Sequence, residues 1–173
     1  VGAVVSALDA RSGERGSVVL LTADHGESLG EKGWFFQHGQ STAPELARVP
    51  LIVVAPGLAP GRLRTLASHV DVAPTLLDLA GLPGLPAPSG RSLLGPMQGE
   101  KASGSRLVFS DTEGESAAYG PESWTRILGP GVSDRAPASA AAQRSESLEL
   151  SVQGHWRPAD LDANAMRELE GYL

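Results

Sequence analysis

The side chains best suited to chemistry in this chain stand in the segment Thr22–Glu27, which reads TADHGE. A carboxylate and an imidazole occupy adjacent positions at Asp24 and His25, and both groups ligate divalent cations in proteins. Gly26 follows them, and a glycine lets the backbone turn sharply and pass close to a ligand. The pattern therefore predicts a cation site at this point of the chain.

The residue types alone leave a plainer interpretation open. Asp24 is also a typical turn former or helix cap, and His25 fits a partly buried, hydrogen-bonded histidine. Glu27 fits a cap for the loop or for a following helix. The position of the pair favours the cation site, because it comes directly after an apolar run and ligands of open α/β sheets bind at the carboxyl ends of strands.

Hydrophobic patterns predict the elements that position this pair. Residues 1–10 carry apolar side chains at helical spacing, and residues 17–24 and 49–56 hold short apolar runs typical of strands buried on both faces. A helix, a polar turn and a buried strand predict an αβ unit of a parallel sheet. Residues 25–49 lack periodicity, and a long loop of this kind is usually functional or disordered.

Further along the chain, residues 71–80 predict a helix with Asp71 as its N-cap. Gly81 after this segment is typical of a helix end. The stretch 82–105 is rich in Pro, Gly and Ser and predicts a loop, and residues 106–112 predict a third strand. The fold class is therefore α/β, with a partial parallel or mixed sheet flanked by helices and a loop-rich C-terminal tail.

The C-terminal third has a different composition. Residues 129–147 contain few large apolar side chains and predict a flexible, linker-like stretch. The alternating segment 147–152, SLELSV, predicts an edge strand, and residues 159–173 predict a terminal helix. The chain thus divides into residues 1–128, the flexible stretch, and residues 148–173.

Composition excludes several classes of protein. The 173 residues carry 14 basic and 20 acidic side chains, a net charge of -6, which disfavours nucleic acid and anionic membrane surfaces as partners. Cysteine is absent, so this chain supplies no disulfide, no cysteine nucleophile and no thiolate ligand. No apolar run reaches the length of about 18 residues that a transmembrane helix needs.

Four sequence blocks together resemble the C-terminal part of the catalytic domain of the sulfatases, which belong to the alkaline phosphatase superfamily. The blocks are TADHGESLGEKGWFFQHG, RVPLIVVAPG, SHVDVAPTLLDLAGLP and GRSLL. They stand in the order and spacing of that family, and the resemblance covers residues 1 to 112. It assigns residues 1–128 to the C-terminal part of a sulfatase-like catalytic domain.

The resemblance implies roles for individual residues. Asp24 and His25 match two of the family's metal ligands, and the metal expected is Ca²⁺, with Mg²⁺, Mn²⁺ and Zn²⁺ as alternatives. His38 matches the family's contact to the sulfate or phosphate group, and it can bind the anion or protonate the leaving oxygen. Lys32 lies in the same block and can approach the anion or remain a solvated surface lysine. Arg48, with the proline two residues on, matches a supporting element.

The family's nucleophile is missing from this sequence. In sulfatases a Cys-x-Pro-x-Arg or Ser-x-Pro-x-Arg element supplies a residue that is oxidised to formylglycine, and no such element stands here. Ser41–Pro44 has the wrong spacing. The resemblance implies that this element, and an Asp-Asp pair that completes the metal site, precede Asp24 by a long stretch. We therefore expect the chain to be a C-terminal fragment of a larger enzyme, with formylglycine in the missing part.

Three functions follow from this interpretation. The first is hydrolysis of sulfuric esters, on a small molecule or a glycan, by a longer parent protein. The second is hydrolysis or transfer of phosphate or phosphonate esters within the same superfamily, and the continuation GESLGE favours the first. The third is an inactive truncated domain, so whether this chain alone is an enzyme stays open. The resemblance implies a periplasmic or extracellular location, and the oligomeric state is not predicted.

The remaining polar and aromatic residues carry weaker predictions. Trp34, Phe35 and Phe36 fit either the wall of a substrate pocket or an anchor to the core. The other candidates are predicted to be structural or, in the acidic cluster, part of a solvated loop: His69, Asp71, the cluster Asp111, Glu113 and Glu115, and the pair His155 and Trp156.

Overall fold

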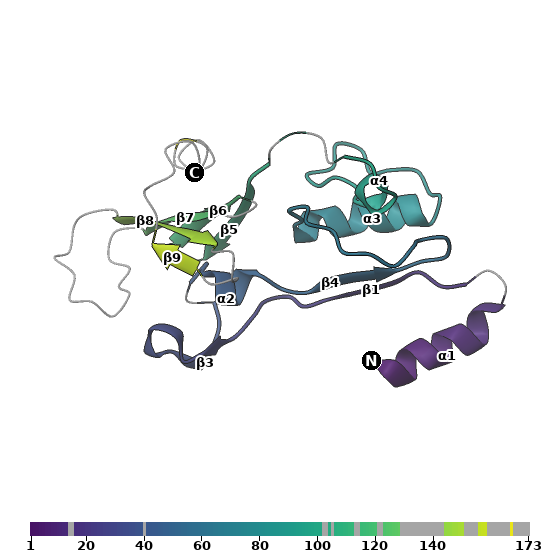
Figure 1. The fold of residues 1–173 in the computed structure, drawn as a ribbon, viewed down its shortest axis with the longest axis horizontal. Coiled ribbons are helices and arrows are strands. Elements are labelled where there is room, and N and C mark those ends of the chain that lie inside the picture. The colour runs from purple at the N-terminus through teal and green to yellow at the C-terminus, as the bar shows by residue number, and fades with distance from the viewer. Residues whose placement is uncertain are drawn as a thin grey trace. The chain divides into compact units, whose positions relative to one another are not determined.

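The computed structural model describes residues 1–13, 16–39, 41–101, 104, 106–112, 115–120, 123–128, 144–150, 156–158 and 167. The chain forms two compact units (Figure 1). The first unit contains Val1–Ala23 and Pro50–Gly104, and the second contains Asp24–Val49 and Ser105–Leu173. Each unit has its own sheet, and the division into segments 1–128, 129–147 and 148–173 stays a prediction.

The first unit combines a two-stranded sheet with helices. The predicted N-terminal helix is present as α1, and both predicted strands are present as β1 and β4. The helix predicted over 71–80 is confirmed as α3, preceded by a single 3-10 turn, η3. The elements are α1 (Gly2–Ser12), β1 (Val19–Thr22), β4 (Leu51–Val54), η3 (His69–Asp71), α3 (Val72–Leu79) and α4 (Leu94–Met97).

Strands β1 and β4 are antiparallel, which corrects the parallel pairing predicted for this unit. The register pairs Thr22, the last residue of β1, with Leu51, the first residue of β4. The reason lies in the connection. The chain leaves this unit after Ala23 and re-enters it at Pro50, so β4 starts where β1 ends and must run back along it.

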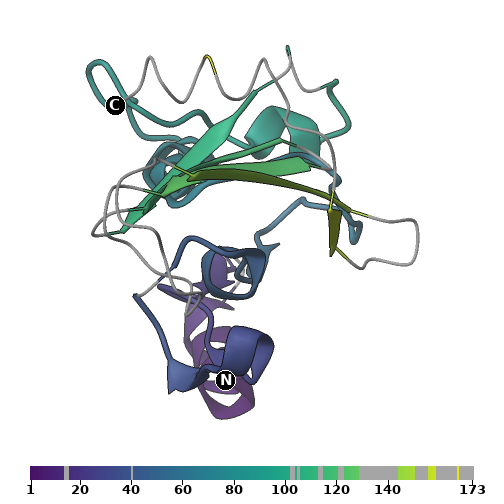
Figure 2. The same ribbon diagram turned by 90° about the vertical axis from the view of Figure 1, so that its left-hand side faces the viewer.

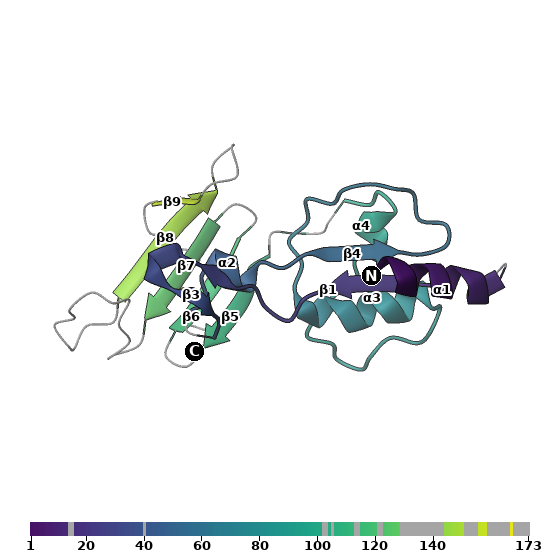
Figure 3. The ribbon, with the colours of Figure 1, turned by 90° about the horizontal axis from the view of Figure 1, so that it is seen from below.

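The prediction that these strands are buried on both faces is wrong for the described chain. Helix α3 lies along one face of the β1–β4 pair (Figures 1 and 3). Side chains of a strand alternate between faces, and Ile52 and Val54 share a face on which they are 54% and 59% exposed. Helix α1 likewise buries none of its residues. Helical and strand periodicity predicted the elements but not what covers them.

Asp71 anchors the turn before α3. Its carboxylate is fully buried and accepts hydrogen bonds from the backbone N–H groups of Ser68 at 2.9 Å and Arg91 at 2.8 Å. The first bond completes a capping box at the 3-10 turn. Asp71 is the N-cap residue of α3, as predicted, but its side chain makes no capping hydrogen bond to α3 and completes the capping box at η3 instead. Gly81 follows α3 with φ 64, as expected for a helix end.

The segment 25–49 is not the structureless loop that the sequence predicted. It forms a hairpin of β2 (Ser28–Leu29) and β3 (Phe35–Gln37), joined by the 3-10 turn η2 (Glu31–Gly33), and then the short helix α2 (Pro44–Ala47). Glycines at 30 and 33, with φ 134 and 77, allow the tight turn. The elements are too short for their periodicity to stand out in the sequence.

The rest of the second unit is an antiparallel sheet of five strands in chain order (Figures 1 and 2). The strand predicted over 106–112 is confirmed as β5. Residues 147–150 of the segment SLELSV belong to β8, which lies between β7 and β9 and is therefore not an edge strand. The strands are β5 (Val108–Thr112), β6 (Glu115–Tyr119), β7 (Ser123–Leu128), β8 (Arg144–Leu150) and β9 (Trp156–Pro158).

Strands β6 and β7 were not predicted, because short, small residues such as those of β6 give no strong alternation. Of the stretch predicted to be flexible, residues 129–143 lie outside the described residues and 144–147 belong to β8. The predicted terminal helix, residues 159–173, lies outside the described residues apart from Arg167, which is helical. His155 and Glu113 also lie outside them.

Candidate functional site

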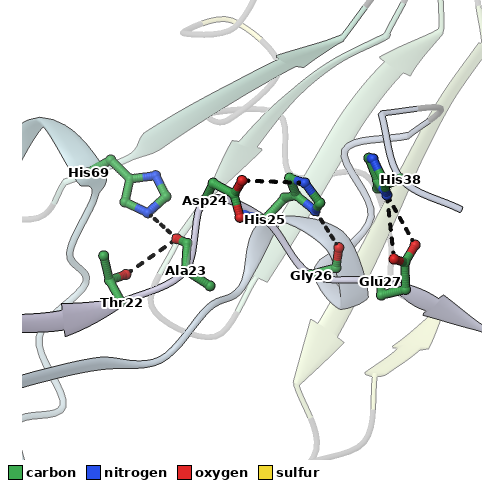
Figure 4. A network of polar contacts seen from close by, with 8 residues as sticks. All are labelled: Thr22, Ala23, Asp24, His25, Gly26, Glu27, His38 and His69. Atoms are coloured by element: carbon green, nitrogen blue, oxygen red, sulfur yellow. Dashed lines mark hydrogen bonds and ion pairs between the residues drawn. The ribbon is translucent and has the colours of Figure 1, made fainter. Parts of the chain in front are cut away.

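The structure brings the predicted site residues of the second unit together. Asp24 and His25 follow the end of β1, and His38 follows β3 at the end of the hairpin. The imidazole rings of His25 and His38 stack, with centroids 4.2 Å apart and an interplanar angle of 22° (Figure 4). Hairpin closure therefore places the anion-contact candidate beside the candidate metal ligands.

Asp24 is held in the ionised form by its own neighbour in sequence. The backbone N–H of His25 donates to Oδ1 of Asp24 at 2.9 Å. This bond, followed by one from the backbone N–H of Asp24 itself, lowers the pKa of the Asp24 carboxyl from its ordinary value. The side chain is 86% exposed, so its oxygens are accessible to a ligand.

The orientation of His25 suits a metal ligand. Its Nδ1 lies 2.7 Å from the carbonyl oxygen of Gly26, so Nδ1–H donates to that oxygen and Nε2 keeps its lone pair. The Nε2 atom lies 3.6 Å from Oδ2 of Asp24. One carboxylate oxygen and one imidazole nitrogen thus face the same small volume, which is a donor set that divalent cations accept.

This donor set is a partial one. Among the residues that the structure describes, no group of three or more His, Asp or Glu side chains is placed to hold a metal ion. Asp24 and His25 fit two positions of a coordination shell whose other ligands would have to come from elsewhere.

Glu27 contacts His38 and does not cap a helix. Its carboxylate oxygens lie 3.3 and 3.4 Å from Nδ1 of His38 (Figure 4). With Nδ1–H donating to Glu27, the Nε2 atom of His38 is available to a substrate. Sequence reasoning assigned Glu27 a cap because the hairpin that brings it to His38 was not predicted.

The turn between these side chains is held by α2. The backbone N–H of Gly26 donates to the carbonyl oxygen of Leu46 at 2.7 Å. A Cβ atom at position 26 would lie 2.0 Å from the carbonyl oxygen of Glu45. The prediction that Gly26 permits a close backbone approach is correct, although the group that approaches is the protein's own helix.

Several other predicted residues are now placed. His69 is structural as predicted, with Nε2 2.8 Å from the carbonyl oxygen of Ala23. Phe35 and Phe36 are 60% and 79% exposed, so they do not anchor the hairpin to the described core. Trp34 is half-buried. The backbone of Lys32 lies in η2, and its side chain is outside the described part of the structure.

The acidic cluster is split by the fold. Asp111 is exposed on β5, as predicted for a solvated residue, but Glu115 on β6 is only 2% exposed. The Glu115 carboxylate accepts hydrogen bonds from Thr42 N–H at 2.7 Å, from Ser41 Oγ at 3.1 Å and from the Thr42 hydroxyl. The prediction of a solvated loop is therefore wrong for Glu115. A sequence signal for its burial is lacking, because its partners lie more than 70 residues away.

The sequence comparisons match this chain to sulfatases. The family model Sulfatase matches residues 1–82. The choline-sulfatase of Rhizobium meliloti (strain 1021) is 46% identical over 66 residues, which are 38% of this chain and 12% of that protein. Arylsulfatase K of Gallus gallus is 37% identical over 103 residues, which are 59% of this chain and 19% of that protein. The chain thus spans less than a fifth of the length of the curated relatives it matches.

Solved structures show the same fold. A protein of the alkaline phosphatase superfamily from Vibrio parahaemolyticus matches with a TM-score of 0.66 and 15% identity, covering 98% of this chain and 36% of that one. The phosphonate monoester hydrolase of Silicibacter pomeroyi matches with a TM-score of 0.68 and 22% identity, covering 99% and 36%. The fold class is therefore that of the alkaline phosphatase superfamily, an α/β fold. Within this fold, residues 1–82 are the part of the chain that resembles a sulfatase domain.

None of the described helices is both long enough and apolar enough to cross a membrane.

Proposed function

We propose that this chain contributes to the hydrolysis of sulfuric esters by a metal-dependent sulfatase. In this proposal the chain supplies two metal ligands and a contact to the anionic group of the substrate. The observation that carries the proposal is the stacking of His38 on His25, beside an Asp24 carboxyl whose pKa is lowered. The sulfatase family match supports the choice of reaction.

Asp24 and His25 are the proposed ligands of a divalent cation, with Ca²⁺ first and Mg²⁺, Mn²⁺ or Zn²⁺ as alternatives. A carboxylate oxygen is the ligand that hard cations prefer, and Nε2 of His25 is directed to the same side. When bound, the cation would neutralise charge on the reacting anionic group. The protein's own contribution is to hold Asp24 ionised and to fix the ring of His25.

His38 is the proposed contact to the sulfate group. Glu27 accepts the Nδ1–H of His38 and orients the ring, which is an imidazolium when Nε2 also carries a proton. The Nε2–H of that imidazolium can then donate a charge-assisted hydrogen bond to a sulfate oxygen or a proton to the leaving oxygen. Lys32 is proposed as a second contact to the anion, from the same hairpin.

The nucleophile has to come from outside these 173 residues, because the sequence holds no cysteine and no serine in the family's pattern. We propose a formylglycine residue in a preceding part of the protein. The reading frame upstream of Val1 tests this directly. A Cys-x-Pro-x-Arg or Ser-x-Pro-x-Arg element there supports a sulfatase, and its absence from the frame contradicts the proposal.

A phosphate or phosphonate ester is the second candidate substrate. The similarity of fold to the Silicibacter pomeroyi phosphonate monoester hydrolase favours it, because the same cation and imidazole can serve either anion. Turnover of p-nitrophenyl sulfate and p-nitrophenyl phenylphosphonate by the protein produced from its full reading frame separates the two. A higher kcat/KM for the sulfate supports our proposal, and the reverse order supports the second candidate.

Three variants test the site assignment. Asp24→Asn and His25→Ala should each lower both turnover and bound metal, whereas His38→Ala should lower turnover by about 10²- to 10⁴-fold with metal retained. Metal content measured by elemental analysis gives the second readout. Full activity in all three variants contradicts the site, and no turnover of either ester by the unmodified protein supports an inactive domain.

We further propose a periplasmic or extracellular location, on the strength of the family alone. Fractionation of the source cells with an antibody to the protein tests it. Recovery with the cytosolic marker would contradict this part of the proposal.

A further inference from the structure

Glu115 is a buried carboxyl group that the proposed reaction does not use. It is 2% exposed on β6 and accepts hydrogen bonds from Ser41 and from both the backbone N–H and the hydroxyl of Thr42. Burial of a carboxyl group is unfavourable unless donors compensate it. These donors are therefore held in fixed positions against β6.

Tyr119, on the same strand, forms a further hydrogen bond to Thr42. It stands four residues after Glu115, and side chains at even separations share a face of a strand. The Tyr119 hydroxyl is buried and donates to the carbonyl oxygen of Thr42. Both backbone hydrogen-bonding groups of Thr42 are thus bound to β6, which fixes the chain at this residue.

The chain on both sides of Thr42 connects to the site residues. Ala43 and Leu46, in and next to α2, are buried, and the Leu46 carbonyl accepts the N–H of Gly26 between the site side chains. In the other direction only two residues separate Ser41 from His38 in the sequence. The segment from Ser41 to Ala47 is therefore joined to the His38 side and to the His25 side of the stacked pair.

We infer that Glu115 is a positioning residue for the His25–His38 pair. By holding Thr42 on β6, it fixes the chain that leads back to His38 and the helix that binds Gly26. The role of His38 on which this inference rests is that of the proposed function. Displacing a reacting group by about 1 Å can cost about 10²-fold in rate. Loss of the Glu115 anchor should therefore slow the reaction, although Glu115 itself does not contact the substrate.

Two buried threonines provide a matched pair of variants. Thr42 is 1% exposed and bonds Glu115 through its hydroxyl. Thr75, in α3 of the other unit, is 0% exposed, and its hydroxyl donates to Asp71 O at 2.7 Å and accepts from Leu93 N–H at 3.0 Å. Thr42→Val and Thr75→Val each remove one buried hydroxyl at nearly constant volume.

The experiment uses the protein produced from its full reading frame, with p-nitrophenyl sulfate as the probe. The variants are Glu115→Gln, Thr42→Val, Tyr119→Phe and the control Thr75→Val, and Tm is measured for each. We expect Glu115→Gln to lower kcat/KM by about 10- to 100-fold and Thr42→Val and Tyr119→Phe to lower it by smaller factors. Thr75→Val should lower Tm comparably and leave kcat/KM within about twofold.

A spectroscopic readout separates positioning from general loss of stability. With isotope-labelled histidine, the imidazole signals of His25 and His38 should shift in Glu115→Gln and Thr42→Val at temperatures well below Tm. They should stay in place in Thr75→Val. If Glu115→Gln does not fold, the variants Thr42→Val and Tyr119→Phe are compared with Thr75→Val in its place.

Two results would overturn the inference. One is unchanged imidazole signals and kcat/KM in Glu115→Gln and Thr42→Val. The other is a loss of rate in Thr75→Val equal to that in Thr42→Val, because the effect would then follow stability alone. Full activity in the His38→Ala variant would contradict the proposed function and not this inference. In that case the shifts of the imidazole signals still test whether Glu115 positions the two rings.

Discussion

Single side chains in this site take their orientation from backbone groups one or two residues away. The N–H of His25 holds the Asp24 carboxylate, and the carbonyl of Gly26 sets the tautomer of His25. The contact between Glu27 and His38 crosses the hairpin, and so does the stacking of His25 on His38. The chemistry of the site is therefore encoded locally, and its assembly depends on one close turn at Gly26.

Gly26→Ala tests that turn. The added Cβ would lie 2.0 Å from the Glu45 carbonyl, which is backbone and cannot yield as a flexible side chain would. We expect a loss of about 1 to 3 kcal/mol in the free energy of unfolding, with weaker divalent cation binding by calorimetry. Gly61→Ala is the control, since a Cβ there meets nothing within 4 Å. Equal stability of the two variants would refute the account of the turn.

At the scale of elements, short turns do most of the positioning. The hairpin of β2 and β3 is closed by η2, where the Glu31 carboxylate accepts the backbone N–H of Leu29 at 2.6 Å. In the first unit, Asp71 joins η3 to the chain at Arg91 in the same way. The roles of Glu31 and Asp71 each lead to a separate prediction about stability.

The pH dependence of the hairpin follows from Glu31. Hydrogen bonds from the backbone N–H of Glu31 itself and of Leu29 lower the pKa of this carboxyl. A lowered pKa in the folded state means that the stabilisation is present above the unfolded pKa and is lost as the pH falls through the folded value. NMR titration should give a Glu31 midpoint below that of an unfolded Glu, and Glu31→Gln should remove this dependence. A midpoint at or above the unfolded value would contradict the hydrogen-bond assignment.

Asp71→Ala should destabilise the first unit. It removes the carboxylate that accepts the part-buried N–H groups of Ser68 and Arg91, at a total cost of about 1 to 3 kcal/mol. Asp78→Ala, on the exposed side of α3, is the matched control and should change the unfolding free energy by less than about 0.5 kcal/mol. Urea unfolding measures both. Similar losses in the two variants would show that Asp71 is not the anchor.

For the whole molecule, the proposed cation site would link binding to stability. A ligand that binds only the folded state stabilises it by RT ln(1 + [L]/Kd), about 2.7 kcal/mol at a concentration 100-fold above Kd. We therefore expect Ca²⁺ to raise the Tm of the protein made from its full reading frame and a chelator to lower it. Asp24→Asn should abolish the shift. An equal Ca²⁺ shift in that variant would place the bound cation elsewhere.

The sequence by itself determined the elements with strong periodicity and the residue types of the site. Helices α1 and α3, strands β1, β4 and β5, and the adjacent pair Asp24 and His25 were predictable because their signals lie within short windows. His38 was singled out only through the resemblance to the sulfatases. Local chemistry also predicted capping at Asp71. A short stretch of sequence does not show which distant residue a side chain contacts, or which element covers a face of a strand or helix.

Only the tertiary structure decided the remaining features. It set the antiparallel pairing of β1 with β4, the exposure of Ile52 and Val54, and the contact between Glu27 and His38. It also buried Glu115 against Thr42, which lies 73 residues earlier in the chain. Such contacts form when segments that are distant in the sequence pack together. They therefore cannot be predicted from the residue types of either segment alone.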